Sequence, residues 1–189
     1  MFTEAQRATL IAIARHAIEQ AVAGTVVEAP PLADAPPASG AFVTIKRDSE
    51  LRGCIGTLEC RRPLADEVAH VAVSAAREDP RFAPLRPAEL NDISIEVSIL
   101  GPLEPVDPAD PAAIIVGRHG LVVEHGRRRG LLLPQVASEW GWNRDEFLAH
   151  TCRKAGLPPD AWRHGATVYR FEAEVFGETR GGSHSTRVE

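Results

Sequence analysis

Residues 41–57 read AFVTIKRDSELRGCIGT, and this stretch decides how the chain around it folds. Residues 41–46 are rich in apolar and β-branched side chains, which is typical of a strand. The polar residues 47–50 favour a turn, and residues 51–57 then lead the chain back. The pattern therefore predicts a β-hairpin whose second strand carries the most specific residues of the sequence.

Cys54 is the residue in this second strand that points most directly to chemistry. On a regular strand Arg52 and Cys54 share one face, while Leu51 and Ile55 point to the opposite, buried face. A fixed positive charge beside a thiol favours the thiolate, which is the nucleophilic and metal-binding form. The alternative is that Cys54 is a small apolar side chain packed in a central strand, because free cysteine is among the most buried residue types. The sequence leaves both interpretations open.

Gly53 and Gly56 stand on either side of the Cys54–Ile55 pair. Glycine weakens the interior of a strand, so its presence there needs a reason. The usual reason is that a ligand or another stretch of backbone approaches too closely for a side chain. We therefore count Gly53 and Gly56 among the candidate binding residues.

Residues 51–57 also resemble the signature of the AMMECR-domain family, in the bacterial and archaeal branch called AmmeMemoRadiSam system protein A. The resemblance is collinear from about residue 41 to residue 176, which makes it specific. It implies an α+β fold with a mainly antiparallel sheet, flanking helices and two unequal lobes with a groove between them. The further matching segments, in family order, are Ser74-Ala75-Ala76, Asp79-Pro80-Arg81-Phe82, Glu89-Leu90, residues 93–100, residues 117–121 with Glu124, and residues 129–137, 139–142 and 152–157.

This resemblance implies two partners, a radical S-adenosylmethionine protein and a Memo-like protein related to metal-dependent ring dioxygenases. Those partners would supply the iron-sulfur and metal chemistry, because this chain lacks a Cys-x3-Cys-x2-Cys motif, and we expect no cofactor of its own. One function hypothesis is an enzyme component in which Cys54 is a nucleophile, redox thiol or substrate carrier and Arg52 lowers its pKa or binds an anion. The other is a non-catalytic module in which the 51–56 strand and the His119 turn form a groove for a partner or small molecule.

His119 lies in a Gly-Arg-His-Gly turn at a position that the family resemblance also marks. It is a candidate base toward Cys54, provided that the fold brings the two together. The alternative is a turn histidine that hydrogen-bonds its own loop. Glu124 matches the family as well, but four or five strand residues span roughly 15 Å. His119, Glu124 and His125 are therefore not expected to form a metal triad.

Asp79 and Arg81 flank Pro80 at a predicted helix end. They are candidates for a structural ion pair, a loop anchor or a binding pair, and the resemblance marks them without choosing. The spacing from Cys54 to Cys60 differs from the Cys-x2-Cys of structural zinc sites, so no metal is predicted.

Composition limits the function classes. A formal charge of -5 and a pI near 5.8 argue against a general nucleic-acid binder, which would be basic. No basic-then-apolar start indicates a signal peptide, and no apolar run approaches the roughly 20 residues of a membrane span. Three cysteines are an odd, sparse set for a disulfide scaffold, so we expect reduced thiols in the cytosol.

The remaining periodicity predicts an α+β chain with one domain over residues 1–177. Residues 113–116, 121–124 and 131–133 are short apolar segments separated by turns, which predicts a three-stranded meander. The other predicted elements are helices over residues 3–23, 63–78 and 143–155, strands over 93–100 and 168–176, a proline-rich connector over 28–40 and a disordered tail over 178–189.

Overall fold

The first two strands form the predicted hairpin. The structure is a computed structural model that describes residues 1–178. Strand β1 (Gly40–Arg47) pairs antiparallel with β2 (Glu50–Thr57). Asp48 and Ser49 make the two-residue turn, with φ angles of 51° and 68°. Positive φ at both central residues is what a type I′ hairpin turn requires, so the polar residues 47–50 act as predicted.

The second strand contains a β-bulge. Ile45 pairs with Gly53 and Lys46 pairs with Leu51, which leaves Arg52 as the extra residue. One extra residue reverses which face the preceding side chains occupy. Leu51 therefore shares a face with Lys46 and is 42% exposed. The expectation that Leu51 lies on the buried face is wrong, because it assumed a regular strand.

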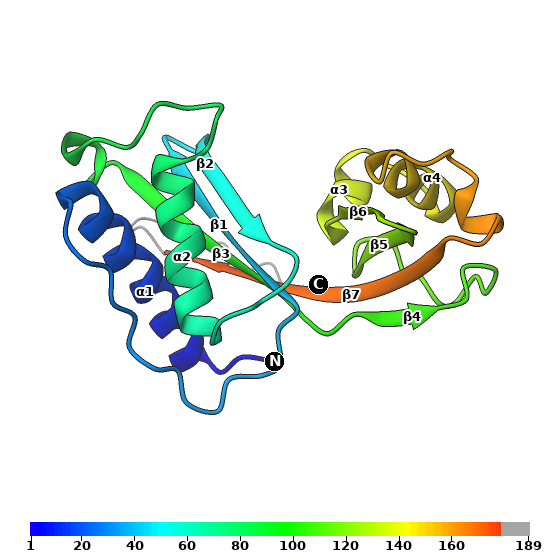
Figure 1. Cartoon of the computed structure of the whole chain (residues 1–189), viewed down its shortest axis with the longest axis horizontal. Coiled ribbons are helices and arrows are strands. Elements are labelled where there is room, and N and C mark those ends of the chain that lie inside the picture. The colour runs from blue at the N-terminus through cyan, green and yellow to red at the C-terminus, as the bar shows by residue number, and fades with distance from the viewer. Residues whose placement is uncertain (179–189) are drawn as a thin grey trace. The chain divides into compact units, whose positions relative to one another are not determined.

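The chain divides into two compact units (Figure 1). Unit 1 holds residues 1–36, 40–99 and the described residues from Val175 onward, and unit 2 holds residues 37–39 and 100–174. The single domain over 1–177 and the groove between two lobes stay predictions. Of the predicted tail, residues 179–189 lie outside the described part. Glu178 belongs to unit 1, where its carboxylate accepts a 2.7 Å hydrogen bond from Arg15 and its amide donates to Ile95.

In unit 1, two helices cover one face of the strands (Figure 1). Helix α1 (Glu4–Ala23) begins at a capping box between Thr3 and Gln6, as predicted, and helix α2 (Leu64–Arg77) begins after Pro63. The strand order is β2-β1-β3, with the end of β7 (Thr167–Gly177) beside β3 (Ile93–Leu100). A short 3-10 helix, Pro87–Glu89, precedes β3. The core side chains include Leu10, Ile13, Ile18, Val43, Ile45, Val68, Val71, Ile95 and Val97.

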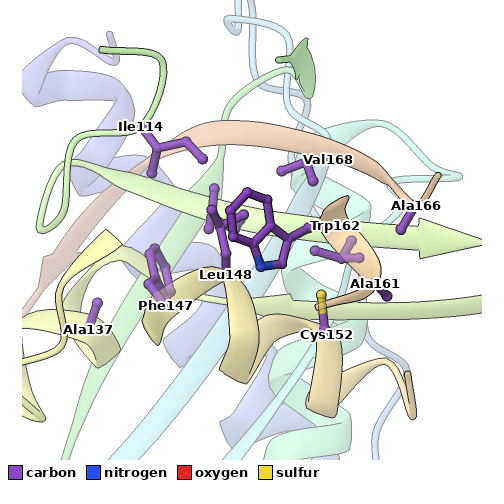
Figure 2. Close-up of a cluster of buried hydrophobic side chains, with 11 residues drawn as sticks. Ile114, Ala137, Phe147, Leu148, Cys152, Ala161, Trp162, Ala166 and Val168 are labelled. Atoms are coloured by element: carbon purple, nitrogen blue, oxygen red, sulfur yellow. The ribbon is translucent and has the colours of Figure 1, made fainter. Parts of the chain in front are cut away.

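In unit 2, β7 pairs with both β4 (Glu104–Val106) and β5 (His119–His125), and β6 (Arg128–Leu132) pairs with the other edge of β5. Helices α3 (Pro134–Glu139) and α4 (Arg144–Lys154) and a 3-10 helix, Ala161–Arg163, complete the unit. Figure 2 shows its core, in which Phe147, Leu148 and Cys152 of α4 pack with Ile114, Trp162 and Val168.

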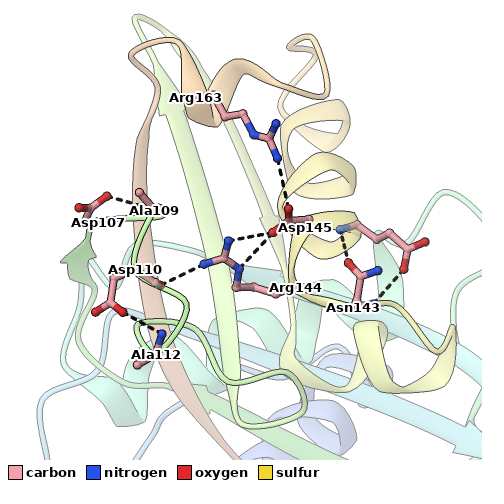
Figure 3. A network of polar contacts seen from close by, with 9 residues as sticks. Asp107, Ala109, Asp110, Ala112, Asn143, Arg144, Asp145 and Arg163 are labelled. Carbon is pink, nitrogen blue, oxygen red and sulfur yellow. Dashed lines mark hydrogen bonds and ion pairs between the residues drawn. The ribbon is translucent and has the colours of Figure 1, made fainter.

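The predicted meander is only partly right. Residues 121–124 fall on β5 and residues 131–132 on its partner β6, but residue 133 precedes α3 and residues 113–116 form a loop. The reason is that β7 occupies the free edge of β5. Arg144 holds the preceding loop by donating to the Asp110 carbonyl at 3.0 Å and to Asp145 at 2.8 Å (Figure 3). Ile114 is buried from this loop rather than from a strand.

These elements confirm the α+β class with antiparallel strand pairs. Within residues 1–178, no helix combines the length and the apolar character needed to cross a membrane.

Candidate functional site

Cys54 lies on the face of the hairpin that points away from the helices. Its neighbour Gly53 faces Ala75 of α2, and adjacent strand residues face opposite ways. Cys54 pairs directly with Thr44, whose hydroxyl donates a 3.2 Å hydrogen bond to the Cys54 Sγ. The thiol is half-buried, in contrast to the fully buried Val43 and Ile45 on the helix side of β1. Cys54 is therefore not part of the core that β1 forms with α2.

The backbone of Cys54 is held by Asp79 and Arg81. Strand β2 is at the edge of the sheet order, so the groups on its outer side need partners. An Asp79 oxygen accepts from the Cys54 amide at 2.9 Å, and Arg81 Nη2 donates to the Cys54 carbonyl at 3.3 Å. The Asp79–Arg81 ion pair, at 2.7 Å, thus takes the place of a neighbouring strand at this one residue.

The two members of this pair differ in exposure. The Asp79 side chain is 2% exposed, whereas that of Arg81 is 54% exposed. Hydrogen bonding to Arg81, opposed by burial and helped by the Cys54 amide, holds the pKa of Asp79 far below its usual range. Asp79 is therefore ionised at neutral pH and serves as a structural anchor for the Cys54 strand.

Arg52 is bound to a different carboxylate. Its Nε and Nη2 donate to the two oxygens of Glu89 at 2.9 and 3.2 Å. This hydrogen bonding to Arg52 lowers the pKa of the buried Glu89 to about 2. Two guanidinium groups contact the Phe82 ring, with the central carbon of Arg52 at 5.9 Å and that of Arg81 at 5.5 Å from the ring centre. The arginine that hydrogen-bonds to Cys54 is thus Arg81 and not Arg52.

Both glycines of the motif make room for groups of this chain. A side chain at Gly53 would overlap the carbonyl oxygen of Ala75 in α2. One at Gly56 would overlap the ring of Phe42, its direct partner across the hairpin. Of the two alternatives that the sequence offers, close approach of a ligand or of the protein itself, the structure shows the second.

His119 is the first residue of β5, in unit 2, and is 4% exposed. Its Nδ1 accepts a 3.0 Å hydrogen bond from the Ile115 amide, which fixes the preceding loop. Burial, with Arg170 and Arg118 nearby, lowers the pKa of His119. The ring is therefore neutral at pH 7 and carries its proton on Nε2. Because His119 and Cys54 belong to different units, a role as base toward Cys54 stays a prediction.

We expect this histidine to make the protein less stable in mild acid. The unfolded chain, with the ordinary pKa of about 6.5, takes up a proton before the folded one. The free energy of unfolding should thus decrease as pH falls below about 6.5, with a slope of at most about 1.4 kcal/mol per pH unit from this group. In His119→Asn, an amide oxygen replaces Nδ1 and does not titrate, so urea unfolding at pH 7 and 5.5 should show a smaller slope. Equal slopes in both proteins would contradict this.

Glu124 forms a cross-strand ion pair with Arg129 at 2.9 Å, and both side chains are about one-third exposed. Cys152 is packed in the core of unit 2, where burial raises the pKa of its thiol (Figure 2). Burial, with a contribution from Glu67, raises the pKa of Cys60 to about 11. No group of three or more His, Cys, Asp or Glu side chains suited to a metal ion occurs within residues 1–178.

Sequence reasoning missed the supporting residues of the site. Thr44 contacts Cys54, Phe82 contacts Arg81 and Glu89 contacts Arg52, and none of the three was among the candidate site residues. The hairpin register, once its turn is known, would have identified Thr44 as the partner of Cys54. The segment from Asp79 to Phe82 carried a signal only through the resemblance.

Comparison with known proteins gives consistent results. The model of the AMMECR1 family matches residues 11–176. A protein of Methanothermobacter thermautotrophicus is 51% identical over 179 residues, which cover 90% of this chain and 93% of the relative. One of Thermococcus gammatolerans is 50% identical over 183 residues, covering 89% and 88%. The crystal structure of the uncharacterised protein PH0010 from Pyrococcus horikoshii superposes with a TM-score of 0.80 at 43% identity, covering 94% of this chain and 93% of that one.

Proposed function

The chain belongs to the AMMECR1 family, and on that premise we propose that it is the protein A component of a three-part AmmeMemoRadiSam system in which Cys54 is the reactive thiol. Its partners are then a radical S-adenosylmethionine protein and a Memo-like protein, which carry the iron-sulfur and metal chemistry. All three cysteines are free, which supports a reducing compartment such as the cytoplasm.

The observation that carries this proposal is the environment of Cys54. The thiol is half-buried on the face away from the helices, and its sulfur receives a hydrogen bond from Thr44. The hydrogen bond from Thr44 fixes the orientation of the sulfur, and Arg81 places a cation on the backbone of the same residue. Asp79 and Arg81 fix the backbone on both sides of the residue. A nucleophile needs this combination of access, charge and fixed position, whereas a packing residue does not.

The second candidate function is a non-catalytic binding module in which the 51–56 strand contacts a partner. Two observations count against the catalytic proposal: the motif glycines accommodate Ala75 and Phe42, and Nδ1 of His119, the candidate base, holds its own loop. Both uses are structural. The two functions are separated by the behaviour of the Cys54 sulfur, because only the first requires it to react.

We expect iodoacetamide at pH 7.5 to modify Cys54 at least about tenfold faster than Cys60 or Cys152, since the thiolate is the reacting species. The raised pKa values of the other two thiols reduce their thiolate fraction, and Cys152 is also fully buried. Quenched time points analysed by peptide mass spectrometry give the three rates. Thr44→Val keeps the side-chain shape but removes the hydroxyl. It should lower the alkylation rate of Cys54 and leave the rates of Cys60 and Cys152 unchanged. Labelling of Cys54 no faster than that of Cys60 would remove the reactive-thiol proposal.

The partnership is tested by co-expressing the tagged chain with the two partner proteins and purifying the complex. The proposal predicts that both partners co-purify and that mass spectrometry finds a small adduct on Cys54 when substrate is turned over. Cys54→Ser should keep the complex and lose the adduct. A variant that keeps full activity of the assembled system would instead favour the binding module.

A further inference from the structure

Arg81 has donors to spare beside the thiol. Its Nε and Nη2 are used by Asp79 and by the Cys54 carbonyl. The two hydrogens of Nη1 make no hydrogen bond to any of residues 1–178. A guanidinium carries five donors in a planar fork, so one nitrogen of this fork remains open to a ligand. At 54% exposure, the side chain is accessible to solvent.

The position of the guanidinium is fixed from three sides. Asp79 binds it edge-on, the Cys54 carbonyl binds Nη2, and the Phe82 ring lies 5.5 Å from its central carbon. Because Nη2 is 3.3 Å from the Cys54 carbonyl oxygen, covalent geometry places it within about 8 Å of the Cys54 sulfur. Nη1 belongs to the same planar group as Nη2, so a small molecule can be long enough to reach both Nη1 and the thiol.

The two carboxylates that bind Arg81 and Arg52 are already paired. Asp79 is bound by Arg81 itself. Glu89 is shared by Arg52 at 2.9 Å, Arg86 at 3.6 Å and Arg47 at 3.8 Å. Two buried carboxylates that are paired with arginines contribute little repulsion toward an incoming anion.

We propose that Arg81 binds an oxyanion of the molecule that reacts with Cys54, so that this substrate carries a carboxylate or phosphate group close to its electrophilic atom. The inference rests on the proposed reactive thiol and adds the class of substrate. It assigns to Arg81 the anion-binding role that the sequence suggested for Arg52. Arg52 is 17% exposed and donates to both oxygens of Glu89, whereas Arg81 offers free donors.

A matched pair of alkylating reagents tests the inference directly. Iodoacetate carries a carboxylate next to its reactive carbon, and iodoacetamide is its neutral counterpart of nearly the same size. In both, the Cys54 sulfur forms a bond to the methylene carbon, iodide leaves with the electron pair of the carbon–iodine bond, and the thiol proton passes to the buffer. The ratio of the two rates cancels any change in the thiolate fraction and reports how strongly the surroundings of Cys54 favour a negatively charged reagent.

For Cys54 the iodoacetate-to-iodoacetamide ratio should exceed that of N-acetylcysteine about tenfold, which is the effect expected of one charge-assisted hydrogen bond. Arg81→Gln should return the ratio to that of the free thiol, and Arg81→Lys should leave an intermediate value. Arg61→Gln, which removes an equal charge from an exposed side chain of unit 1, serves as the matched control and should keep the wild-type ratio. Circular dichroism establishes that each variant is folded.

The outcomes separate the two proposals. A Cys54 that reacts with neither reagent overturns the reactive thiol itself. A Cys54 that reacts with both at the ratio of the free thiol overturns only the role of Arg81, and the wild-type protein alone suffices for this result. Protection from iodoacetate by inorganic phosphate would identify a phosphate-bearing substrate, and protection by acetate a carboxylate.

Discussion

Gly53→Ala should lower the free energy of unfolding by about 3 kcal/mol, the upper end of the usual cost of overpacking, although it adds a single methyl group. The new Cβ would overlap the carbonyl oxygen of Ala75, which is backbone in the last turn of α2. Helix backbone cannot move aside as the end of a side chain can, so the strand and the helix must separate. Urea unfolding followed by circular dichroism measures the loss.

Gly120→Ala in unit 2 is the matched control. There the new Cβ would overlap the ring of Phe171, its direct partner across β5 and β7. This overlap can be relieved by substituting the side chain, whereas an overlap with backbone cannot. Phe171→Leu should thus recover about 1 kcal/mol or more of the Gly120→Ala loss in a double-mutant cycle. Ala75→Gly should recover nothing of the Gly53→Ala loss, and a recovery there would show that the contact is not with the backbone of α2.

Part of this hairpin was predictable from the sequence. Alternating apolar residues and a polar turn are local signals, and they identified both strands and the turn between them. The bulge at Arg52 carries no local signal. Its position depends on groups that are distant in the chain, because Arg52 binds Glu89 and Gly53 must face Ala75. A pattern of alternation cannot reveal one extra residue, so Leu51 was assigned to the wrong face.

The segment 113–116 shows the same limit. A short apolar run predicts burial, but burial is available to a loop as well as to a strand. Ile114 is buried while Ile115 is 47% exposed, and the Ile115 amide is used by His119 instead of by a neighbouring strand. Whether this segment becomes a loop or a strand depends on β7. The pairing of β7 with β5 joins residues about 50 positions apart in sequence.

For the candidate site, the sequence singled out the central residues but not their supporting residues or their connections. Cys54, Asp79 and Arg81 were all identified, and the ion pair was among the expected roles of the last two. Its attachment to Cys54 joins residues 25 and 27 positions apart, which no local pattern encodes. From the sequence, Arg52 was expected to be the cation beside Cys54, because it is two residues away. In the structure Arg52 binds Glu89, and Arg81 is the arginine that hydrogen-bonds to Cys54.

Asp79→Asn should cost about 3 kcal/mol at pH 7, because replacing a buried carboxylate that accepts several hydrogen bonds leaves some of its donors unsatisfied. The carboxylate accepts from the amides of Cys54 and Arg81 as well as from the Arg81 guanidinium. An asparagine supplies one acceptor oxygen and no charge. The edge of β2 at Cys54 should therefore loosen, and hydrogen exchange of the Cys54 amide should quicken together with the loss of stability.

The same anchor should make the wild-type protein sensitive to acid. The pKa of Asp79 is lower in the folded state than in the unfolded chain, where it is about 3.9. Its contribution is thus complete at neutral pH and is lost as pH falls below about 4 toward the lowered value. The Asp79→Asn protein lacks this contribution at every pH. The stabilities of the wild-type and Asp79→Asn proteins should therefore converge in acid. Glu89 titrates in both, which leaves Asp79 as the source of the difference.

Urea unfolding of both proteins at pH 7, 4 and 2.5 measures this convergence. Glu59→Gln is the control, because both side chains of the Glu59–Arg61 ion pair are exposed. This pair should contribute less than about 1 kcal/mol to the free energy of unfolding at any of these pH values. If the difference between wild type and Asp79→Asn were the same at all three pH values, the charge of Asp79 would not be what holds the Cys54 strand. The uncharged hydrogen bonds would then carry the anchor, and the guanidinium of Arg81 would lose the partner that fixes it beside the thiol.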